Sequence, residues 1–257
     1  MNLCDYNTIR DLLARHGFHF SKSMGQNFLI DPEVPRRIAE ASGADAGCGV
    51  LEIGPGIGPL TAELAQRAGK VVAVELDRAL LPVLAETMAP YPNVEVVPGD
   101  VLKLDLTAIA AEKFQGLTPI VCANLPYNVT SPILEKLVES PCFTAFTVMI
   151  QREVARRLCA PQGSSEGGSF SLFLQYYMKP ELLFDVPPEK FLPAPKVTSA
   201  VIRCVRRERP AVDVADEGFF FKVMRGGFLL RRKTLANSLS AALPGIPKES
   251  IQQAIAD

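Results

Sequence analysis

The sequence contains no run of about 20 uninterrupted apolar residues, the length that an α-helix needs to cross a membrane. Its first residues, 1–6, read MNLCDY and lack the basic-then-apolar layout of a signal peptide. These absences predict a protein of the cytoplasm that has no membrane partner. Apolar residues nevertheless make up 48% of the 257 residues, which is enough for a sizeable folded core.

Patterns of metal ligands are also scarce. The six cysteines are scattered, with no C-x-x-C pair and no nearby histidine cluster, so free thiols are expected rather than disulfides or a zinc site. The only two histidines, His16 and His19, have the spacing of half a metal site, but no further ligand accompanies them. We expect no metal and no catalytic histidine, because a catalytic base needs an orienting partner.

The formal net charge of −1 argues superficially against a nucleic-acid partner, but the distribution of charge is more informative. Residues 203–233 hold nine basic and four acidic residues, a local balance of +5, so the rest of the chain carries −6. This asymmetry is consistent with one face that binds phosphates, and equally with a solvated helical surface.

Short apolar runs alternate with helix-like stretches between residues 49 and 151, which predicts a parallel sheet covered by helices on both faces. Two later apolar segments are expected to close this sheet as an antiparallel pair. The expected strands are 50–53, 71–75, 94–97, 119–123 and 143–150, the closing pair is 182–186 with 199–205, and the expected helices are 59–68, 78–87, 132–139 and 151–160.

Strand signals vanish after about Glu208, and residues 219–230 and 232–242 have helical periodicity. We therefore expect two domains, a catalytic domain of residues 1–207 and a small helical domain of residues 208–257. Because the chain stops within an expected helix, we expect the second domain to be incomplete.

Residues 52–58, EIGPGIG, follow a strand and precede a helix, where glycines let a ligand approach the backbone closely. The glycine spacing differs from the G-x-G-x-x-G of dinucleotide enzymes, and the loop has no lysine for a P-loop. A nucleoside-bearing cofactor such as S-adenosylmethionine is favoured, bound against Gly54 and Gly56. A purely structural tight turn remains open at this point.

Two acidic residues follow successive strands. Glu75 ends the second strand, 21 positions after Gly54, where an acid can accept hydrogen bonds from both ribose hydroxyls. Asp100 follows the third strand and is placed to meet an adenine amine. Either acid alone is more often a helix cap or a solvated group, but the two together narrow the cofactor to S-adenosylmethionine.

The segment Asn124-Leu125-Pro126-Tyr127 ends the fourth strand and is interpreted as catalytic. The exocyclic amine of adenine is a poor nucleophile, and acceptance of its hydrogens by the Asn124 oxygen and a backbone carbonyl aims its lone pair at the methyl group. Pro126 stiffens the loop and leaves carbonyls free, and Tyr127 offers a flat face for a flipped base. No general base other than water is required, because methyl transfer from a sulfonium depends mainly on alignment. The alternative is a turn with a buried tyrosine.

Five segments occur in an order that resembles the KsgA/RsmA-type small-subunit ribosomal RNA adenine dimethyltransferase family. They are 25–29 (GQNFL), 52–56 (EIGPG), 124–128 (NLPYN), 191–197 (F-x-P-x-P-K-V) and 231–235 (RRKTL). The resemblance extends over residues 25–239 and departs from the family pattern in the loop 164–170. It implies an α/β fold, namely a Rossmann-like class I S-adenosylmethionine-dependent methyltransferase sheet with a small C-terminal helical domain.

The resemblance also implies roles for single residues. Asn27 and Leu29 would cover the cofactor, alongside Gly54, Glu75, Asp100 and Asn124, and Phe191 would close on the target base opposite Tyr127. Arg231, Arg232 and Lys233 would dock RNA phosphates. The implied activity is dimethylation of two adjacent adenines near the 3′ end of small-subunit (16S) ribosomal RNA, by a monomer acting on an immature 30S particle during small-subunit biogenesis.

Three alternatives remain. A large-subunit adenine methylase of the macrolide-resistance type is disfavoured by Ile57 and Leu125, where those enzymes usually carry a lysine-containing turn and an isoleucine. A ribosome-assembly factor of the same fold without turnover is disfavoured by the intact acids and the intact Asn124 loop. A DNA adenine methylase more often has an acidic residue in place of Asn124.

Overall fold

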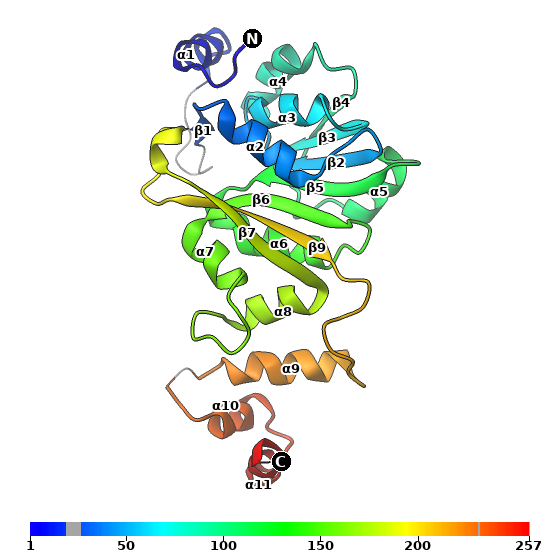
Figure 1. The fold of residues 1–257 in the computed structure, drawn as a ribbon, viewed down its shortest axis with the longest axis vertical. Helices are drawn as coiled ribbons and strands as arrows, with labels where there is room; N and C mark the ends of the chain where they lie inside the picture. The colour runs from blue at the N-terminus through cyan, green and yellow to red at the C-terminus, as the bar shows by residue number, and fades with distance from the viewer. Residues whose placement is uncertain (19–26, 231, 257) are drawn as a thin grey trace. The chain divides into compact units, whose positions relative to one another are not determined.

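The computed structural model describes residues 1–18, 27–230 and 232–256 (Figure 1). The chain divides into two compact units, of which the first comprises Met1–Ala155 and Lys179–Arg206, and the second Arg156–Met178 and Arg207–Asp257. The second unit thus takes in a stretch that the sequence analysis placed with the catalytic domain. The assignment of one unit to catalysis and of the other to RNA docking stays a prediction.

Among the described residues, seven strands form one sheet in the order β4-β3-β2-β5-β6-β9-β7. Their bounds are β2 Cys48–Ile53, β3 Lys70–Glu75, β4 Val94–Pro98, β5 Thr118–Asn124, β6 Ala145–Gln151, β7 Met178–Val186 and β9 Ser199–Arg206. The strands from β4 to β6 pair in parallel, whereas β9 is antiparallel to β6. The two segments expected to close the sheet are indeed neighbours, as β7 and β9.

The helices of the first unit connect these strands. They are α1 Tyr6–Arg15, α2 Glu33–Ser42, α3 Pro59–Ala65, η2 Arg78–Leu80, α4 Leu81–Met88, α5 Leu106–Lys113, η3 Tyr127–Val129, α6 Thr130–Val138 and η4 Pro188–Lys190, and α7 Arg152–Leu158 spans the boundary between the units. Side-chain caps start two helices that the sequence analysis did not predict, because Asp5 accepts from the Thr8 N–H of α1 and Asp105 from the Ala108 N–H of α5.

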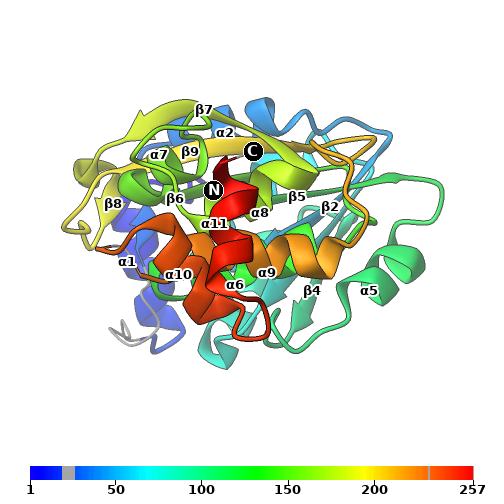
Figure 2. The same cartoon turned by 90° about the horizontal axis from the view of Figure 1, so that it is seen from below.

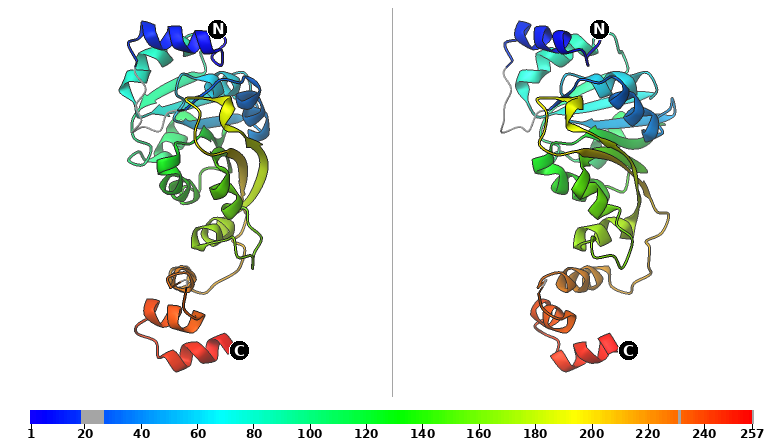
Figure 3. Two further views of the ribbon diagram at one scale, coloured as in Figure 1. Left: turned by 90° about the vertical axis from the view of Figure 1, so that its left-hand side faces the viewer. Right: turned by 60° about the vertical axis from the view of Figure 1, so that its left-hand side comes forward.

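Helices cover both faces of the sheet, as the sequence analysis predicted. Successive residues of β2 point to opposite faces. Val50 packs in a core cluster with Ala39 of α2 and Leu64 of α3. A Cβ atom on Gly49 would lie 2.3 Å from the ring of Phe114, which directly follows α5. The helices α2 and α3 therefore lie on one face and α5 on the other, and Figure 3 shows α2 and α5 on opposite sides of the sheet.

The strand order reverses its direction between β2 and β5, because the chain runs outward from β2 through β3 to β4 and then returns to β5. Such a switch point opens a crevice at the carboxyl ends of the two strands, where ligands of α/β proteins bind. The residues directly after β2 and at the end of β5 are Gly54 and Asn124. A second, two-stranded ribbon pairs β1 Phe28–Leu29 with β8 Phe191–Leu192.

The second unit is helical, with α8 Ser169–Tyr177, α9 Glu217–Gly227, α10 Leu235–Ala242 and α11 Lys248–Ala256. Aromatic rings join α8 to α9, with the Tyr176 and Phe221 centroids 5.1 Å apart. α10 lies against α9 and α11 against α10 (Figure 2). Over residues 1–18, 27–230 and 232–256, every helix is too short or too polar to cross a membrane.

Candidate active site

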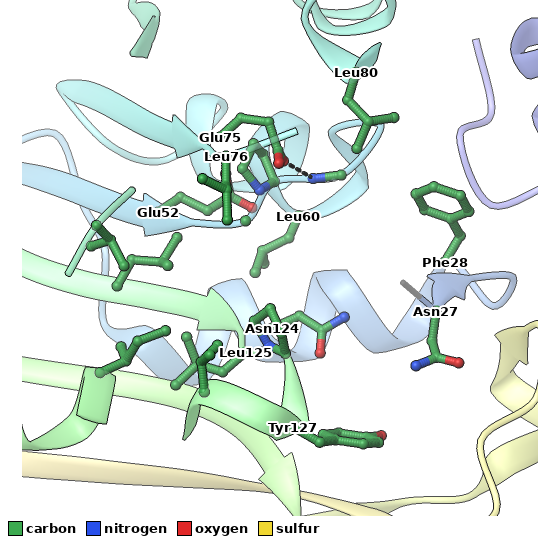
Figure 4. Close-up of a pocket in the computed structure, with 18 of the residues that line it drawn as sticks. Asn27, Phe28, Glu52, Leu60, Glu75, Leu76, Leu80, Asn124, Leu125 and Tyr127 are labelled. Carbon is green, nitrogen blue, oxygen red and sulfur yellow. Dashed lines mark hydrogen bonds between the residues drawn. The ribbon is translucent and has the colours of Figure 1, made fainter. Parts of the chain in front are cut away.

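A pocket of the first unit lies at the carboxyl ends of β2, β3 and β5 and is bordered by the β1–β8 ribbon (Figure 4). It gathers every residue that the sequence analysis assigned to catalysis or cofactor binding. These are Asn27, Leu29, Gly54, Gly56, Glu75, Asp100, Asn124, Leu125, Pro126, Tyr127 and Phe191. Their roles stay predictions, but segments far apart in the sequence meet in one place.

The residues predicted to bind RNA are not part of this pocket. Arg232 and Lys233 are exposed residues of the second unit. Arg231 lies outside the described residues, as do His19 and the first two residues of the 25–29 segment. The described residues hold no group of three or more histidine, cysteine or acidic side chains that could bind a metal ion.

The glycine turn presents its backbone to the pocket. Gly54 has a φ of +66° and Gly56 a φ of +64°, a region that strains any residue with a Cβ atom. A Cβ atom on Gly56 would also lie only 3.3 Å from the ring of Phe28. Glycine at these positions therefore permits both the turn and the close approach of a ligand.

Glu75 is held by the backbone around it. Its Oε2 accepts from the Gly56 N–H at 3.3 Å, drawn as a dashed line in Figure 4, and its Oε1 accepts from the Asp77 N–H at 2.8 Å. Burial raises the pKa of the Glu75 carboxyl, and the two N–H donors offset part of that rise. These hydrogen bonds fix the Glu75 side chain, whose carboxyl group contacts the glycine turn and also lines the pocket.

The Asp100 carboxylate interacts with the protein and is also accessible from the pocket. Its Oδ1 accepts from the Leu102 N–H at 3.0 Å, which closes the turn after β4, and its Oδ2 lies 3.8 Å from the Lys103 ammonium. The side chain is 27% exposed, so a ligand can still reach it. Both interpretations from the sequence, a local cap and a ligand acceptor, are compatible with this geometry.

The carbonyl groups of the loop after β5 differ in one respect from the prediction. From the sequence, the carbonyls around Pro126 are expected to be free. The Pro126 carbonyl instead accepts from the Val129 N–H at 3.3 Å and from the Thr130 hydroxyl at 3.0 Å, because the chain turns at once into η3 and α6. The Leu125 N–H donates to the Met149 carbonyl at 3.1 Å, which keeps the start of the loop attached to β6.

The two aromatic residues of the site differ in exposure. Tyr127 is partly buried, and its hydroxyl hydrogen-bonds the Ser199 hydroxyl at 2.6 Å. Burial raises the pKa of the Tyr127 phenol, so the group is neutral at physiological pH. Phe191 lines the pocket but is only 2% exposed, and it belongs to a core cluster with Leu29 and Val34. Only a small part of the Phe191 ring therefore faces the pocket.

The ribbon places Leu29, which was predicted to cover the cofactor, beside Phe191. Leu29 pairs with Phe191 across the two strands, and the Ile30 N–H donates to the Lys190 carbonyl at 2.9 Å. The Lys190 ammonium also lies 2.6 Å from the Asp31 carboxylate, whose pKa is lowered chiefly by this hydrogen bond. The two strands of the ribbon are therefore joined by backbone pairing and by an ion pair.

Several residues of the pocket were not assigned a role from the sequence, and three of them bear on the chemistry of a ligand. Leu76 directly follows Glu75 and is 55% exposed, and Val101 directly follows Asp100. An apolar residue after each acid was a usable signal, because a flat heterocycle needs apolar contacts beside its polar ones. The third is Glu52, the buried acid that precedes the glycine turn.

The pocket fits a nucleoside cofactor. The bare glycine backbone admits close approach, Glu75 and Asp100 supply acceptors, and Leu76 and Val101 supply apolar surface. The Oε2 atom of Glu52 is buried without a hydrogen-bond partner among the described residues. A buried polar atom without a partner is unusual in a native protein and calls for a physical explanation.

Comparisons with known proteins agree with this geometry. A family model described as "Ribosomal RNA adenine dimethylase" matches residues 17–257. The chain is 50% identical over 245 residues to "Ribosomal RNA small subunit methyltransferase A" of Bacillus mycoides (strain KBAB4), covering 95% of this chain and 84% of the relative. The protein of the same name from Bacillus cereus (strain AH187) matches with the same identity and coverage.

Two solved structures are also similar. The 23S rRNA methyltransferase ErmE has a TM-score of 0.71 at 29% identity, over 89% of this chain and 88% of that chain. A dimethyladenosine transferase from Plasmodium falciparum has a TM-score of 0.72 at 28% identity, over 84% of this chain and 77% of that chain.

Proposed function

The chain belongs to the ribosomal RNA adenine dimethylase family, and on that premise we propose that it dimethylates the 6-amino groups of two adjacent adenines near the 3′ end of small-subunit ribosomal RNA. The expected fold, a class I S-adenosylmethionine-dependent methyltransferase sheet with a helical C-terminal region, is confirmed. The expected enzyme class, a ribosomal RNA adenine dimethyltransferase, is confirmed as well.

The observation that carries the proposed chemistry is the position of the Asn124 loop beside Glu75 and Asp100 in one pocket. The methyl donor and the acceptor amine must meet within a few ångströms, and a shared pocket provides this. S-adenosylmethionine supplies a sulfonium methyl group that needs only a well-aimed nucleophile. The chain's part in the reaction is therefore to hold, orient and shield.

One group of pocket residues binds the cofactor. Glu75 accepts from the ribose hydroxyls with the lone pairs that Gly56 and Asp77 leave available, and Asp100 accepts from the adenine amine of the cofactor. Leu29 of the β1–β8 ribbon and Asn27, which directly precedes β1, cover the cofactor. Together these residues fix the cofactor before the RNA base arrives.

A second group of pocket residues orients the target adenine, which accepts the methyl group. The Asn124 side-chain oxygen accepts one hydrogen of the target amine. We assign the second acceptor to the Leu125 carbonyl, since the Pro126 carbonyl already accepts from two donors within the protein. The ring of Tyr127 stacks on the flipped base, whose unstacking from the RNA costs a few kcal/mol. Phe191 closes on the opposite face of the base.

RNA binding is assigned to residues of the second unit. Arg231, Arg232 and Lys233 bind phosphates and set the register of the RNA without reading bases. The substrate is small-subunit ribosomal RNA within an immature 30S particle, and the enzyme acts on it as a monomer in the cytoplasm during small-subunit biogenesis.

Large-subunit RNA is the second candidate substrate, because the fold of ErmE is similar over 89% of this chain. Sequence identity favours the small subunit, since the relatives that share 50% of their residues with this chain are small-subunit methyltransferases. Ile57 and Leu125 favour it too, as the sequence analysis argued.

The test is to incubate the protein with labelled S-adenosylmethionine and either small or large ribosomal subunits that lack the modification. We expect label only in small-subunit RNA, with mass spectrometry locating dimethyladenine at two adjacent positions near the 3′ end. Label confined to large-subunit RNA would replace the small-subunit proposal with the second candidate. Bound but unlabelled subunits would support an assembly factor without turnover.

A further inference from the structure

A lysine outside the pocket makes a hydrogen bond that neither the proposed binding of the cofactor nor the proposed orientation of the base explains. Lys136 of α6 is partly buried, and its ammonium donates to the Leu102 carbonyl at 2.8 Å. Leu102 lines the pocket, whereas Lys136 does not. No carboxylate in the described part of the chain forms an ion pair with Lys136. Burial of an ammonium costs free energy unless a partner compensates it, so the Leu102 carbonyl is the partner that keeps Lys136 in place.

Leu102 belongs to the turn that follows β4 and presents Asp100 to the pocket. The peptide group between Leu102 and Lys103 is held at both ends, because its N–H donates to the Asp100 carbonyl at 2.8 Å and its carbonyl accepts from Lys136. The Asp100 carboxylate also accepts from the Leu102 N–H at 3.0 Å. The bonds made by Asp100 are local to the turn, whereas the donor of Lys136 comes from 34 positions away. Lys136 therefore ties the turn to a separate element of the fold.

The helix that carries Lys136 is a rigid support. Its buried apolar side chains are Ile133, Leu134, Leu137 and Val138. The Thr130 hydroxyl at the start of the same helix donates to the Pro126 carbonyl at 3.0 Å, which joins α6 to the Asn124 loop. A side chain on a packed helix is positioned more precisely than one on a loop. One helix thus contacts both the loop proposed to orient the target adenine and the turn proposed to bind the adenine of the cofactor.

We propose that Lys136 is a positioning residue, which fixes the Asp100 turn and thereby sets the preference of the pocket for a purine that carries a 6-amino group. Lys136 touches neither the cofactor nor the RNA. It acts through the Leu102 carbonyl on the turn, and through the turn on the Asp100 carboxylate. The inference rests on the proposed function, because it needs the adenine of S-adenosylmethionine beside Asp100.

The effect of Lys136 on selectivity follows from the geometry of hydrogen bonds. A bond from the 6-amino group to the Asp100 carboxylate depends on distance and direction, and it weakens steeply when donor and acceptor are misaligned. Without the ammonium, the Leu102 carbonyl loses its partner, and the peptide group that follows Leu102 is free to rotate. The Asp100 carboxylate, which is bonded to the same turn, then no longer meets the amine in one fixed position. Contacts of the cofactor with Glu75 and the glycine turn do not depend on Lys136.

Calorimetric binding of two ligands tests the proposal without any RNA. The ligands are S-adenosylhomocysteine and its 6-deamino analogue, which has hydrogen in place of the amine. The wild-type protein is expected to bind S-adenosylhomocysteine roughly 10- to 100-fold more tightly than the analogue, because the amine donates to a charged acceptor. Lys136→Met keeps most of the length of the side chain and removes the donor. In this variant the ratio of the two affinities is expected to fall by about tenfold, because only the binding of S-adenosylhomocysteine weakens.

Two further variants serve as controls. Lys136→Arg retains a charged donor and should restore most of the ratio. Lys179→Met removes an exposed lysine of β7, outside the pocket, and should bind both ligands as the wild type does. Denaturant unfolding of each variant measures any loss of stability separately from the loss of selectivity.

An unchanged ratio in Lys136→Met overturns the inference even if the free energy of unfolding falls, because a purely structural role would weaken the binding of both ligands alike or of neither. A wild-type protein that does not distinguish the two ligands also overturns it and leaves the proposed methyl transfer intact. Failure of both S-adenosylmethionine and S-adenosylhomocysteine to bind the wild type overturns the inference and the proposed function together. If Lys136→Met does not fold, Lys136→Gln, which keeps a shorter and neutral donor, takes its place and is judged by the same ratio.

Discussion

The phenol oxygen of Tyr127 lies 2.6 Å from the hydroxyl oxygen of Ser199, a residue 72 positions later in the chain. Ser199 is the first residue of β9 and is fully buried. The hydrogen bond therefore holds the Tyr127 hydroxyl beside the last residue of β6, Gln151, with which Ser199 pairs. The flat face proposed to receive the base is oriented by a strand, although Tyr127 itself begins the short helix η3.

Removal of this hydrogen bond by Ser199→Ala is expected to loosen the ring without touching the cofactor. A neutral hydrogen bond contributes about 1 kcal/mol, so kcat/KM for the RNA substrate should fall roughly five- to tenfold. The dissociation constant of S-adenosylmethionine should stay unchanged. Steady-state kinetics with small subunits and calorimetry with the cofactor measure the two quantities separately.

Tyr127→Phe removes the same hydrogen bond from its other end and keeps the stacking face. The double variant should then be no worse than either single variant, because the two substitutions delete one interaction. Additive losses in kcat/KM would show that Ser199 acts through something other than the orientation of Tyr127.

Asn124→Ala is expected to abolish methyl transfer while leaving cofactor binding measurable. The variant loses the side-chain acceptor that aims the lone pair of the adenine amine, but it keeps Glu75 and the glycine turn. Transfer of labelled methyl groups to RNA and calorimetric binding of S-adenosylmethionine are measured on the same preparation. Asn7→Ala on the exposed face of α1 is the control and should behave as wild type. Wild-type-like transfer by Asn124→Ala would refute the proposed mechanism.

The parts of this site that could be predicted are those that lie at the end of a recognisable parallel strand. The glycine turn, Glu75 and Asn124 each end an apolar strand, and parallel strands bring their carboxyl ends to one edge of the sheet. Strand β2 illustrates why this prediction succeeded: it is buried along its whole length, so its residues form a continuous apolar run broken only by Gly49 and Glu52.

The remaining features depend on contacts between distant segments. The partnership of Tyr127 with Ser199 and the burial of Phe191 by Leu29 arise from pairings that no local pattern encodes. The engagement of the Pro126 carbonyl is a local contact instead, and it depends on how tightly the chain turns into α6. Helix α5 is a different case, since Asp105 before an apolar stretch is an N-cap signal that was present in the sequence and went unused.

Glu75→Gln should weaken cofactor binding by roughly 10- to 100-fold, because the ribose hydroxyls and the Gly56 N–H lose a charged acceptor and gain a neutral one. S-adenosylmethionine and S-adenosylhomocysteine share the ribose, so both affinities should fall by the same factor. Calorimetry with each ligand provides the comparison. Glu112→Gln, at a side chain of α5 that is 70% exposed, is the matched control. An effect restricted to S-adenosylmethionine would mean that Glu75 senses the sulfonium charge and does not bind the sugar.

The stability of the protein should decrease as pH rises from 6 to 9. The pKa of Glu52 is raised from 4.5 to about 8 in the folded protein, so folding favours its protonated form. That contribution is fully present below pH 4.5 and is lost as pH rises through about 8, which amounts to a loss on the order of 2 kcal/mol between pH 6 and 9. Denaturant unfolding at several pH values measures it. In Glu52→Gln the free energy of unfolding should depend less on pH than in the wild type, and equal slopes in the two proteins would show that Glu52 is ionised throughout.

Replacement of both Arg232 and Lys233 by alanine should weaken RNA binding without altering cofactor affinity. Each phosphate contact releases counterions, so the slope of log K against log salt should shrink by about 0.7 to 0.9 for each charge removed. Binding of small-subunit RNA is measured at several salt concentrations, with Arg10→Ala plus Lys179→Ala as a control that removes two exposed charges elsewhere. If the control pair reduces the slope as much as the test pair, the effect belongs to overall charge, and the assignment of Arg232 and Lys233 to phosphate docking fails. A loss of affinity with an unchanged slope would point instead to contacts that involve no phosphate, which would require these side chains to meet bases or protein.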